Sequence, residues 1–140
     1  MTQTRRQFVG TGLAVAAAFF GLPQLASAAE LEEALNAFTG AADMASDGIT
    51  LIAPEIAENG NTVPIEVSAP GAEAIMLLAA GNPQADVCTF NFGPAAGSAA
   101  ASTRIRLAGE QDVIAVARMP DGTFKQARQT VRVTIGGCGG

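Results

Sequence analysis

The sequence predicts a mainly β protein, an Ig-like antiparallel β-sandwich with a short N-terminal helix and a flexible C-terminal arm. Three observations predict this fold. From residue 49 onward, short apolar runs follow one another, turn-forming residues separate them, and several runs alternate apolar with polar side chains. Such alternation is typical of strands that bury one face, and close turn spacing is typical of an antiparallel sandwich.

The N-terminal segment, residues 1–29, has the three-part plan of an export signal. Arg5 and Arg6 provide the positive region, an uncharged apolar stretch follows, and small residues allow cleavage after Ala28 or Ala29. The adjacent arginines in TRRQFVG are typical of a twin-arginine signal. Because the apolar stretch is short and broken by glycine and proline, we expect export to the periplasm rather than a membrane-spanning helix. Residues 30–135 then form the folded domain.

The composition excludes several classes of function. Cleavage of the signal would leave 6 basic and 13 acidic residues, a net charge of −7, which disfavours binding to nucleic acid or to anionic membranes. The chain has no histidine, so neither a Ser-His-Asp nor a Cys-His catalytic set can form. Two cysteines and scattered acids give no recognisable metal or cofactor spacing. We therefore expect no His-dependent catalytic set and no metal or cofactor.

The basic residues of the mature chain gather in its C-terminal part. They are Arg104, Arg106, Arg118, Lys125, Arg128 and Arg132. One interpretation is the ordinary solvent face of two strands, and the other is a basic side near the C-terminal arm that binds an anion or an acidic partner. The sequence leaves open whether Arg104, Arg106 or Arg132 contacts a bound anion.

The helix is expected at residues 30–40. Its apolar residues recur at helical spacing, acids crowd its first turn, and Gly40 can end it; the apolar positions are Leu31, Ala34, Leu35 and Phe38. Seven strands are expected after it, at residues 49–53, 62–69, 73–80, 86–92, 102–108, 112–119 and 130–135.

Alternation assigns the faces of three of these strands. The residues expected to face the core are Val63, Ile65, Val67 and Ala69, then Thr103, Ile105 and Leu107, then Val131, Val133 and Ile135. Pro64 lacks a backbone N–H, which predicts that its strand lies at a sheet edge.

The first cysteine, Cys88, is in phase with Phe90 and Phe92 and out of phase with Val87, Thr89 and Asn91. This phase places its side chain on the core face, where a free cysteine behaves as a small apolar residue. An exported protein with two cysteines often forms a disulfide, but a buried sulfur is hard for a flexible tail to reach. We therefore expect a structural role for Cys88.

The second cysteine, Cys138, lies in the terminal GGCGG, residues 136–140. Its neighbours have no side chains to shield the thiol and few backbone restraints; they are Gly136, Gly137, Gly139 and Gly140. Fully extended, this segment spans roughly 17 Å. The pattern predicts a reactive thiol on a slender arm that can enter another protein's active site. The alternatives are an incidental cysteine on a flexible end, or a periplasmic structural or interaction module whose Cys138 forms intermolecular disulfides.

The chain as a whole resembles the SoxY family of the bacterial Sox thiosulfate-oxidation system. The resemblance rests on TRRQFVG, on the terminal GGCGG, and on two stretches of the body, ITLIAPEIAENGNTVPIEV and NFGPAAGSAAASTRIRLA. It implies a carrier that catalyses nothing and needs no cofactor of its own. It also implies a heterodimer with a SoxZ-like subunit, which has no signal and is exported already bound.

The resemblance further implies that Cys138 is the covalent attachment point. A c-type haem enzyme would join thiosulfate to its sulfur as a cysteine S-thiosulfonate. A di-metal hydrolase would then release sulfate, and a sulfur dehydrogenase would oxidise the remaining sulfane sulfur before a second hydrolysis. All three enzymes would bind only transiently, and Cys88 receives no role.

Overall fold

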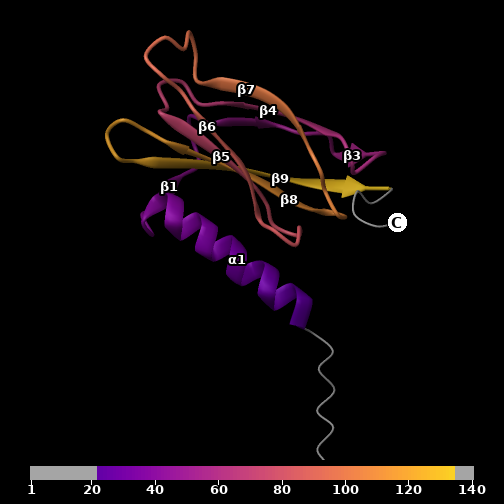
Figure 1. Cartoon of the computed structure of the whole chain (residues 1–140). Helices are drawn as coiled ribbons and strands as arrows, with labels where there is room; N and C mark the ends of the chain where they lie inside the picture. Colours follow the sequence, from indigo (N-terminus) through magenta and orange to yellow (C-terminus); the bar gives the residue numbers. More distant parts are fainter. Residues whose placement is uncertain (1–21, 135–140) are drawn as a thin grey trace, which may run out of the picture.

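The computed structural model describes residues 22–134, which form one α-helix and two facing β-sheets (Figure 1). Within this part of the chain the larger sheet has six strands. Its order is β1 (Met44–Ala45), β9 (Phe124–Val133), β8 (Gln111–Arg118), β5 (Ala74–Ala79) and β6 (Asp86–Asn91), with β3 (Ile56–Ala57) paired to β9. The smaller sheet has the order β2 (Thr50–Ile52), β4 (Val63–Ser68) and β7 (Ala100–Ile105). The predicted mainly β sandwich with an N-terminal helix is confirmed.

The core lies between the two sheets, and the expected alternation is largely confirmed. On β4, Val63, Ile65 and Val67 are buried while Pro64 and Glu66 are exposed. The same holds further along the chain for the buried residues Ala69, Ile105, Leu107 and Val131, whereas Thr103 and Val133 are half-buried. These side chains contact the inward-facing residues of β5 and β8 in one apolar cluster. Burial of this cluster is the main term that stabilises the sandwich.

Helix α1 (Leu22–Thr39) covers part of the outer face of the larger sheet. Strand β5 is buried along its whole length because its two faces contact different partners. One face lies in the core between the sheets, and the other forms a second cluster with α1; the helix contributes Leu31, Ala34, Leu35 and Phe38. The Phe38 ring meets the Phe124 ring edge to face, with centroids 5.9 Å apart. The predicted apolar stripe of the helix is therefore confirmed.

The helix begins earlier than the predicted residue 30. It starts at Leu22, because the alanine-rich stretch before Glu30 also has high helix propensity. It ends at Thr39, and Gly40 follows with a positive φ of 65°. The helix thus runs across the predicted cleavage point, and the boundary at residue 29 remains a prediction.

Three strands differ from the expectation. β1 and β3 are two residues long, too short to leave a periodic signal in the sequence. β9 begins at Phe124 rather than at residue 130, because the whole of β8 pairs with residues 124–131. The first half of β9 is rich in polar residues, so the requirement for a partner along β8 overrides the local pattern.

The prediction that Pro64 marks an edge strand was wrong. β4 lies in the middle of the smaller sheet, between β2 and β7. However, β2 pairs only with residues 66–68 of β4, so the side of the strand away from β7 has no partner at Pro64. A proline lacks only one backbone N–H. It is therefore tolerated where the neighbouring strand is missing at that single position.

Strand β6 carries a β-bulge that changes the predicted faces. Leu77 pairs with Cys88 and Leu78 pairs with Asp86, so Val87 is the extra residue. Val87 and Cys88 therefore both contact the core, although alternation predicted opposite faces for them. Cys88 packs on the core as expected, but it is half-buried rather than enclosed, because β6 is the edge of its sheet.

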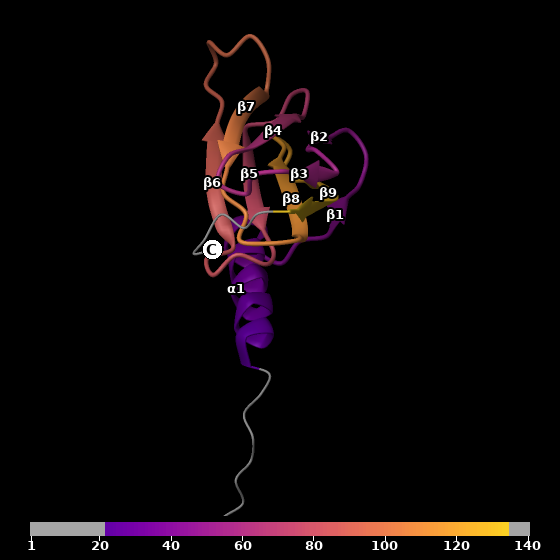
Figure 2. The same ribbon diagram turned by 90° about the vertical axis from the view of Figure 1, so that its right-hand side faces the viewer.

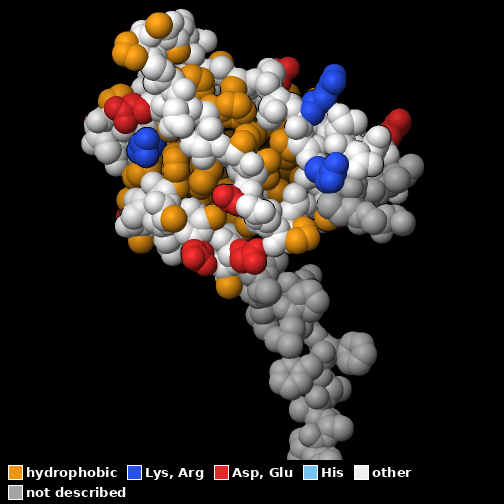
Figure 3. Space-filling model, in the orientation of Figure 1, with side chains coloured by type: hydrophobic (Ala, Val, Ile, Leu, Met, Phe, Trp, Pro, Cys, Tyr) orange, Lys and Arg blue, Asp and Glu red, His pale blue; other side chains and the backbone are white. Residues whose placement is uncertain are grey.

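The sandwich is open on the side formed by β6 and β7. Figure 2 shows both strands along the same side, and neither has a further strand beside it in the described structure. Half-buried side chains line this opening, including Phe90, Phe92 and Ala101. Figure 3 shows hydrophobic side chains gathered across the middle of the face seen in Figure 1. The core therefore reaches the surface on this side.

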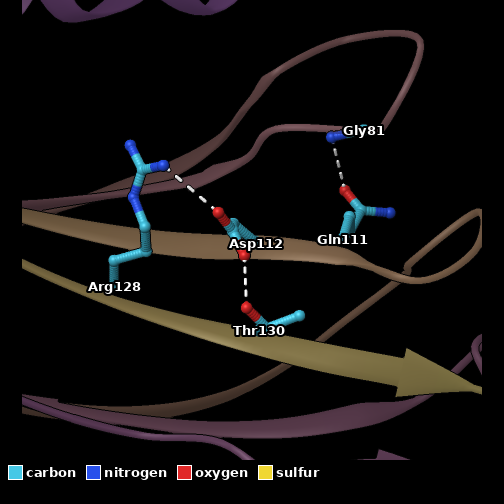
Figure 4. Close-up of polar contacts among 5 residues, drawn as sticks. All are labelled: Gly81, Gln111, Asp112, Arg128 and Thr130. Carbon is cyan, nitrogen blue, oxygen red and sulfur yellow. Dashed lines mark hydrogen bonds and ion pairs between the residues drawn. The ribbon is translucent and has the colours of Figure 1, made fainter.

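A buried glutamine joins two loops at one end of the sandwich. The Gln111 side-chain oxygen accepts a hydrogen bond from the Gly81 N–H at 2.9 Å (Figure 4). Its amide donates to the Asn82 side-chain oxygen at 2.9 Å, which also accepts from the Ala108 N–H. The Asn82 amide in turn donates to the Arg106 carbonyl oxygen at 2.8 Å. This network fixes the backbone that follows β7.

We expect Gln111→Ala to lower the free energy of unfolding by about 1–3 kcal/mol, because it leaves the Gly81 N–H without its acceptor. Urea unfolding measures the loss. Gln84→Ala is the matched control: its amide bonds to Asp86 at the surface, and its removal should cost less than about 0.5 kcal/mol. Equal effects for the two variants would contradict the assigned role of Gln111.

We expect Cys88→Ala to lower the free energy of unfolding by about 0.5–1.5 kcal/mol, because it removes a half-buried sulfur from the core contact. Thr89→Ala, an exposed position on the same strand, should have a smaller effect. Thermal unfolding of both variants at one pH tests this. A Cys88→Ala protein as stable as the parent would show that the sulfur makes no useful core contact.

Candidate functional site

The predicted reactive residue, Cys138, lies outside the described residues, as do the glycines around it, Gly136, Gly137, Gly139 and Gly140. The last described residue is Thr134. The site can therefore be built up to the point at which the chain leaves the sandwich. We call this point the arm root and define it as residues 55–58 and 132–134.

The arm root is held by hydrogen bonds between two parallel chain segments. The Arg132 N–H donates to the Glu55 carbonyl oxygen at 2.9 Å, and the Thr134 N–H donates to the Ala57 carbonyl oxygen at 3.0 Å. The Thr134 hydroxyl also donates to the Glu58 carbonyl oxygen at 3.0 Å. Sequence analysis missed this contact because β3 is too short to show a period. The bonds fix the backbone just before the predicted arm.

The surroundings of the arm root combine charge with exposed apolar surface. A shallow pocket lies against it, lined by Glu55, Ile56, Glu110, Gln129, Thr130 and Arg132. Within the part of the chain that is described, the exposed large apolar side chains are Ile52 (55% exposed) and Ile56 (57% exposed). Ile56 lies in the arm root, and Ile52 ends β2 next to Ala53, whose carbonyl oxygen accepts a hydrogen bond from the Gln129 amide.

Three of the six basic residues of the mature chain are paired with acids. Arg118 lies 3.8 Å from Glu73, and Arg132 lies 3.8 Å from Glu110. Asp112 accepts hydrogen bonds from Arg128 at 3.2 Å and from the Thr130 hydroxyl at 2.6 Å (Figure 4).

Two arginines of the predicted basic side differ from these. Arg104 and Arg106 are exposed, and neither forms an ion pair with any residue in the described range. Sequence reasoning could not separate them from the other basic residues, because the acids that pair with the others are distant in the chain.

Cys88 is a free thiol in the described structure. Partial burial removes water from the sulfur and raises the pKa of the Cys88 thiol above its ordinary value. Because the thiolate is the nucleophile, a raised pKa lowers the reactivity of this cysteine at neutral pH. These properties fit the structural role expected from the sequence. The structure does not test a disulfide between Cys88 and Cys138.

Among residues 22–134, no group of three or more His, Cys, Asp and Glu side chains is placed to hold a metal ion. No helix in the same range is both long and apolar enough to cross a membrane.

Comparison with known proteins identifies the family. The family model for the sulfur oxidation protein SoxY matches residues 35–138, a range that includes Cys138. Among solved structures, the sulfur carrier protein SoxY from Chlorobium limicola f thiosulfatophilum is similar, with a TM-score of 0.66 and 33% sequence identity. The match covers 77% of this chain and 99% of that chain.

Other solved structures share the fold at lower identity. The superoxide reductase (neelaredoxin) from Ignicoccus hospitalis matches with a TM-score of 0.55 and 17% identity, covering 63% of this chain and 81% of that one. A putative superoxide reductase from Thermotoga maritima matches with a TM-score of 0.51 and 17% identity, covering 61% of this chain and 84% of that one. No curated protein sequence matches. The family model and the SoxY carrier structure agree with the resemblance found in the sequence, and the chain therefore belongs to the SoxY family of sulfur oxidation proteins.

Proposed function

We propose that this protein is a covalent carrier of sulfur-oxidation intermediates in periplasmic thiosulfate oxidation, with Cys138 as the attachment point. The observation that carries the proposal is the SoxY family match, which extends to Cys138, together with the similarity to a SoxY sulfur carrier protein. In this role the chain presents a bound intermediate to enzymes and catalyses no step itself.

The chemistry of loading requires an external oxidant. A disulfide-type bond forms between the Cys138 sulfur and the outer sulfur of thiosulfate, giving a cysteine S-thiosulfonate. The thiol proton goes to solvent, and two electrons leave to a c-type haem enzyme. A di-metal hydrolase and a sulfur dehydrogenase then act on the adduct. The haems and metals of this cycle belong to those partners.

The geometry of the arm root supports presentation of a thiol to other proteins. Thr134 is hydrogen-bonded to residues 57 and 58, so the segment that follows it, which includes Cys138, starts from a fixed position. Glycine allows many backbone conformations, and its lack of a side chain keeps the segment narrow. Ordering such a segment costs about 1–2 kcal/mol per residue, which favours brief contacts with each enzyme.

The proposal includes a compartment and a permanent partner. The twin-arginine-type segment around Arg5 and Arg6 supports export to the periplasm. That route carries folded proteins, and a SoxZ-like subunit bound before export would explain why a chain without a cofactor uses it. Neither nucleic acid nor membrane is proposed as a partner.

The competing function is a periplasmic structural or interaction module whose Cys138 links copies by disulfides. This alternative rests on the same feature, a cysteine flanked by glycines, because an unshielded thiol oxidises readily in that compartment. The two functions differ in whether Cys138 carries sulfur adducts during turnover.

We expect Cys138→Ser to abolish thiosulfate oxidation in a reconstituted Sox system and to leave the thermal midpoint unchanged. The hydroxyl cannot form the sulfur–sulfur bond, and the residue makes no predicted contact with the core. Oxygen uptake or haem reduction with thiosulfate measures activity, and calorimetry measures stability. Oxidation at the normal rate by the serine variant would reject the carrier function.

Cys88→Ala is the matched control for the other thiol. We expect it to support thiosulfate oxidation at the parental rate at temperatures where it stays folded, because Cys88 is a structural residue. Loss of activity without loss of stability would show that Cys88 takes part in the chemistry.

A further inference from the structure

We propose that Arg104 and Arg106 form an anion-binding site on this protein, at which the sulfur–oxygen anion attached to Cys138 is held between visits to enzymes. The inference rests on the proposed carrier function and adds to it a site for the loaded state. Its ligand class is a sulfonate or thiosulfonate carried by the protein's own arm.

The charges of the described surface single out these two residues. Arg118, Arg128 and Arg132 each pair with an acid. Lys125 has no ion pair among the described residues, but it is half-buried and lies at the start of β9, away from the arm root. Arg104 and Arg106 are exposed and have no ion pair with described residues. They are two positions apart, on the outward side opposite the buried Ile105 and Leu107. Two guanidinium groups on one side can bind several oxygens of a single anion, because each presents a rigid fork of N–H donors.

The backbone that carries the two arginines is fixed. Arg104 lies in β7 and pairs with Pro64 of β4. The Arg106 carbonyl oxygen accepts a hydrogen bond from the Asn82 amide at 2.8 Å, and the Leu107 N–H donates to the Gly60 carbonyl oxygen at 2.8 Å. A fixed backbone lowers the entropy cost of binding, since only the arginine side chains must be ordered.

The arm root and the arginines belong to one end of the sandwich. The Thr134 hydroxyl donates to the Glu58 carbonyl oxygen. Gly60 lies two residues after Glu58, and its carbonyl oxygen accepts from the N–H of Leu107, the residue that follows Arg106. Two residues span at most about 7 Å, and the four residues from Thr134 to Cys138 span at most about 14 Å. An extended arginine side chain adds several ångströms. The loaded sulfur can therefore meet the guanidinium groups without any movement of the sandwich.

The other charges near the arm root disfavour binding of an anion beside β3. Glu55 and Glu58 contribute the carbonyl oxygens that hold the root, and their side chains are exposed anions. Arg132, the nearest basic residue to Cys138 in the sequence, is already paired with Glu110. On the face seen in Figure 3, Lys and Arg side chains lie mainly toward the end of the molecule at which β9 stops in Figure 1. An anionic adduct is thus repelled on the β3 side and attracted toward Arg104 and Arg106.

The test uses tetrathionate on the full-length mature chain, because it loads the arm without an enzyme. The Cys138 thiolate attacks one inner sulfur of the dianion, a bond to that sulfur forms, and thiosulfate leaves with the electron pair. The product is the cysteine S-thiosulfonate, so no further oxidant is needed. Stopped-time sampling with peptide mass mapping gives the rate at Cys138. The neutral disulfide 2,2′-dithiodipyridine reports the reactivity of the thiol without the charge.

We expect the double variant Arg104→Gln, Arg106→Gln to react with tetrathionate about fivefold more slowly at low ionic strength, while its rate with the neutral disulfide stays within twofold of the parent. Arg128→Gln is the control for loss of positive charge away from the site, with a change below twofold. Replacement of both arginines by lysine should restore most of the rate. In the unsubstituted protein, salt at 1 M should reduce the tetrathionate rate but not the neutral one.

Equal tetrathionate rates in the parent, the double glutamine variant and Arg128→Gln would overturn the inference. If the double variant does not fold, the salt dependence of the parent and the side-chain NMR signals of Arg104 and Arg106 on loading decide the question, and unchanged signals overturn it. The carrier function is tested separately by Cys138→Ser, so it can stand while the arginine site fails.

Discussion

The short parallel pairing between β3 and the end of β9 is the constraint on which the proposed function depends. Hydrogen bonds from Arg132 and Thr134 to residues 55–58 fix the last described residues of the chain. Behind them lies an apolar core between two sheets, and α1 covers part of the outer face of the larger sheet. Because the backbone at Thr134 is fixed, the distance that the Cys138 thiol can reach from the sandwich is limited. A frayed end of β9 would not set this limit.

The sequence predicted the features of the fold that depend on local pattern. Alternation on β4 placed Val63, Ile65 and Val67 in the core, and the continuous apolar run of β5 became understandable once α1 covered its second face. It could not predict features set by distant partners. The bulge at Val87 depends on pairing with β5, and the central place of Pro64 depends on where β2 stops.

The sequence likewise predicted only part of the candidate site. Cys138 stands out in the sequence because four glycines surround it, and no structural information was needed to select it. The arm root and the difference between paired and unpaired arginines became visible only with the fold, because Glu73, Asp112 and Glu110 reach their partners across strands. Partial burial raises the pKa of the Cys88 thiol, and its side chain packs against the core, which favours a structural role for this cysteine.

Intact mass spectrometry of the mature protein, purified natively from cells that are oxidising thiosulfate, tests the carrier function most directly. The account predicts sulfur and sulfur–oxygen adducts that map to Cys138 and are removed by a thiol reductant, with Cys88 unmodified. Cys138 found only in a disulfide, whether with Cys88 or with a second copy, and without any adduct after turnover, would contradict it.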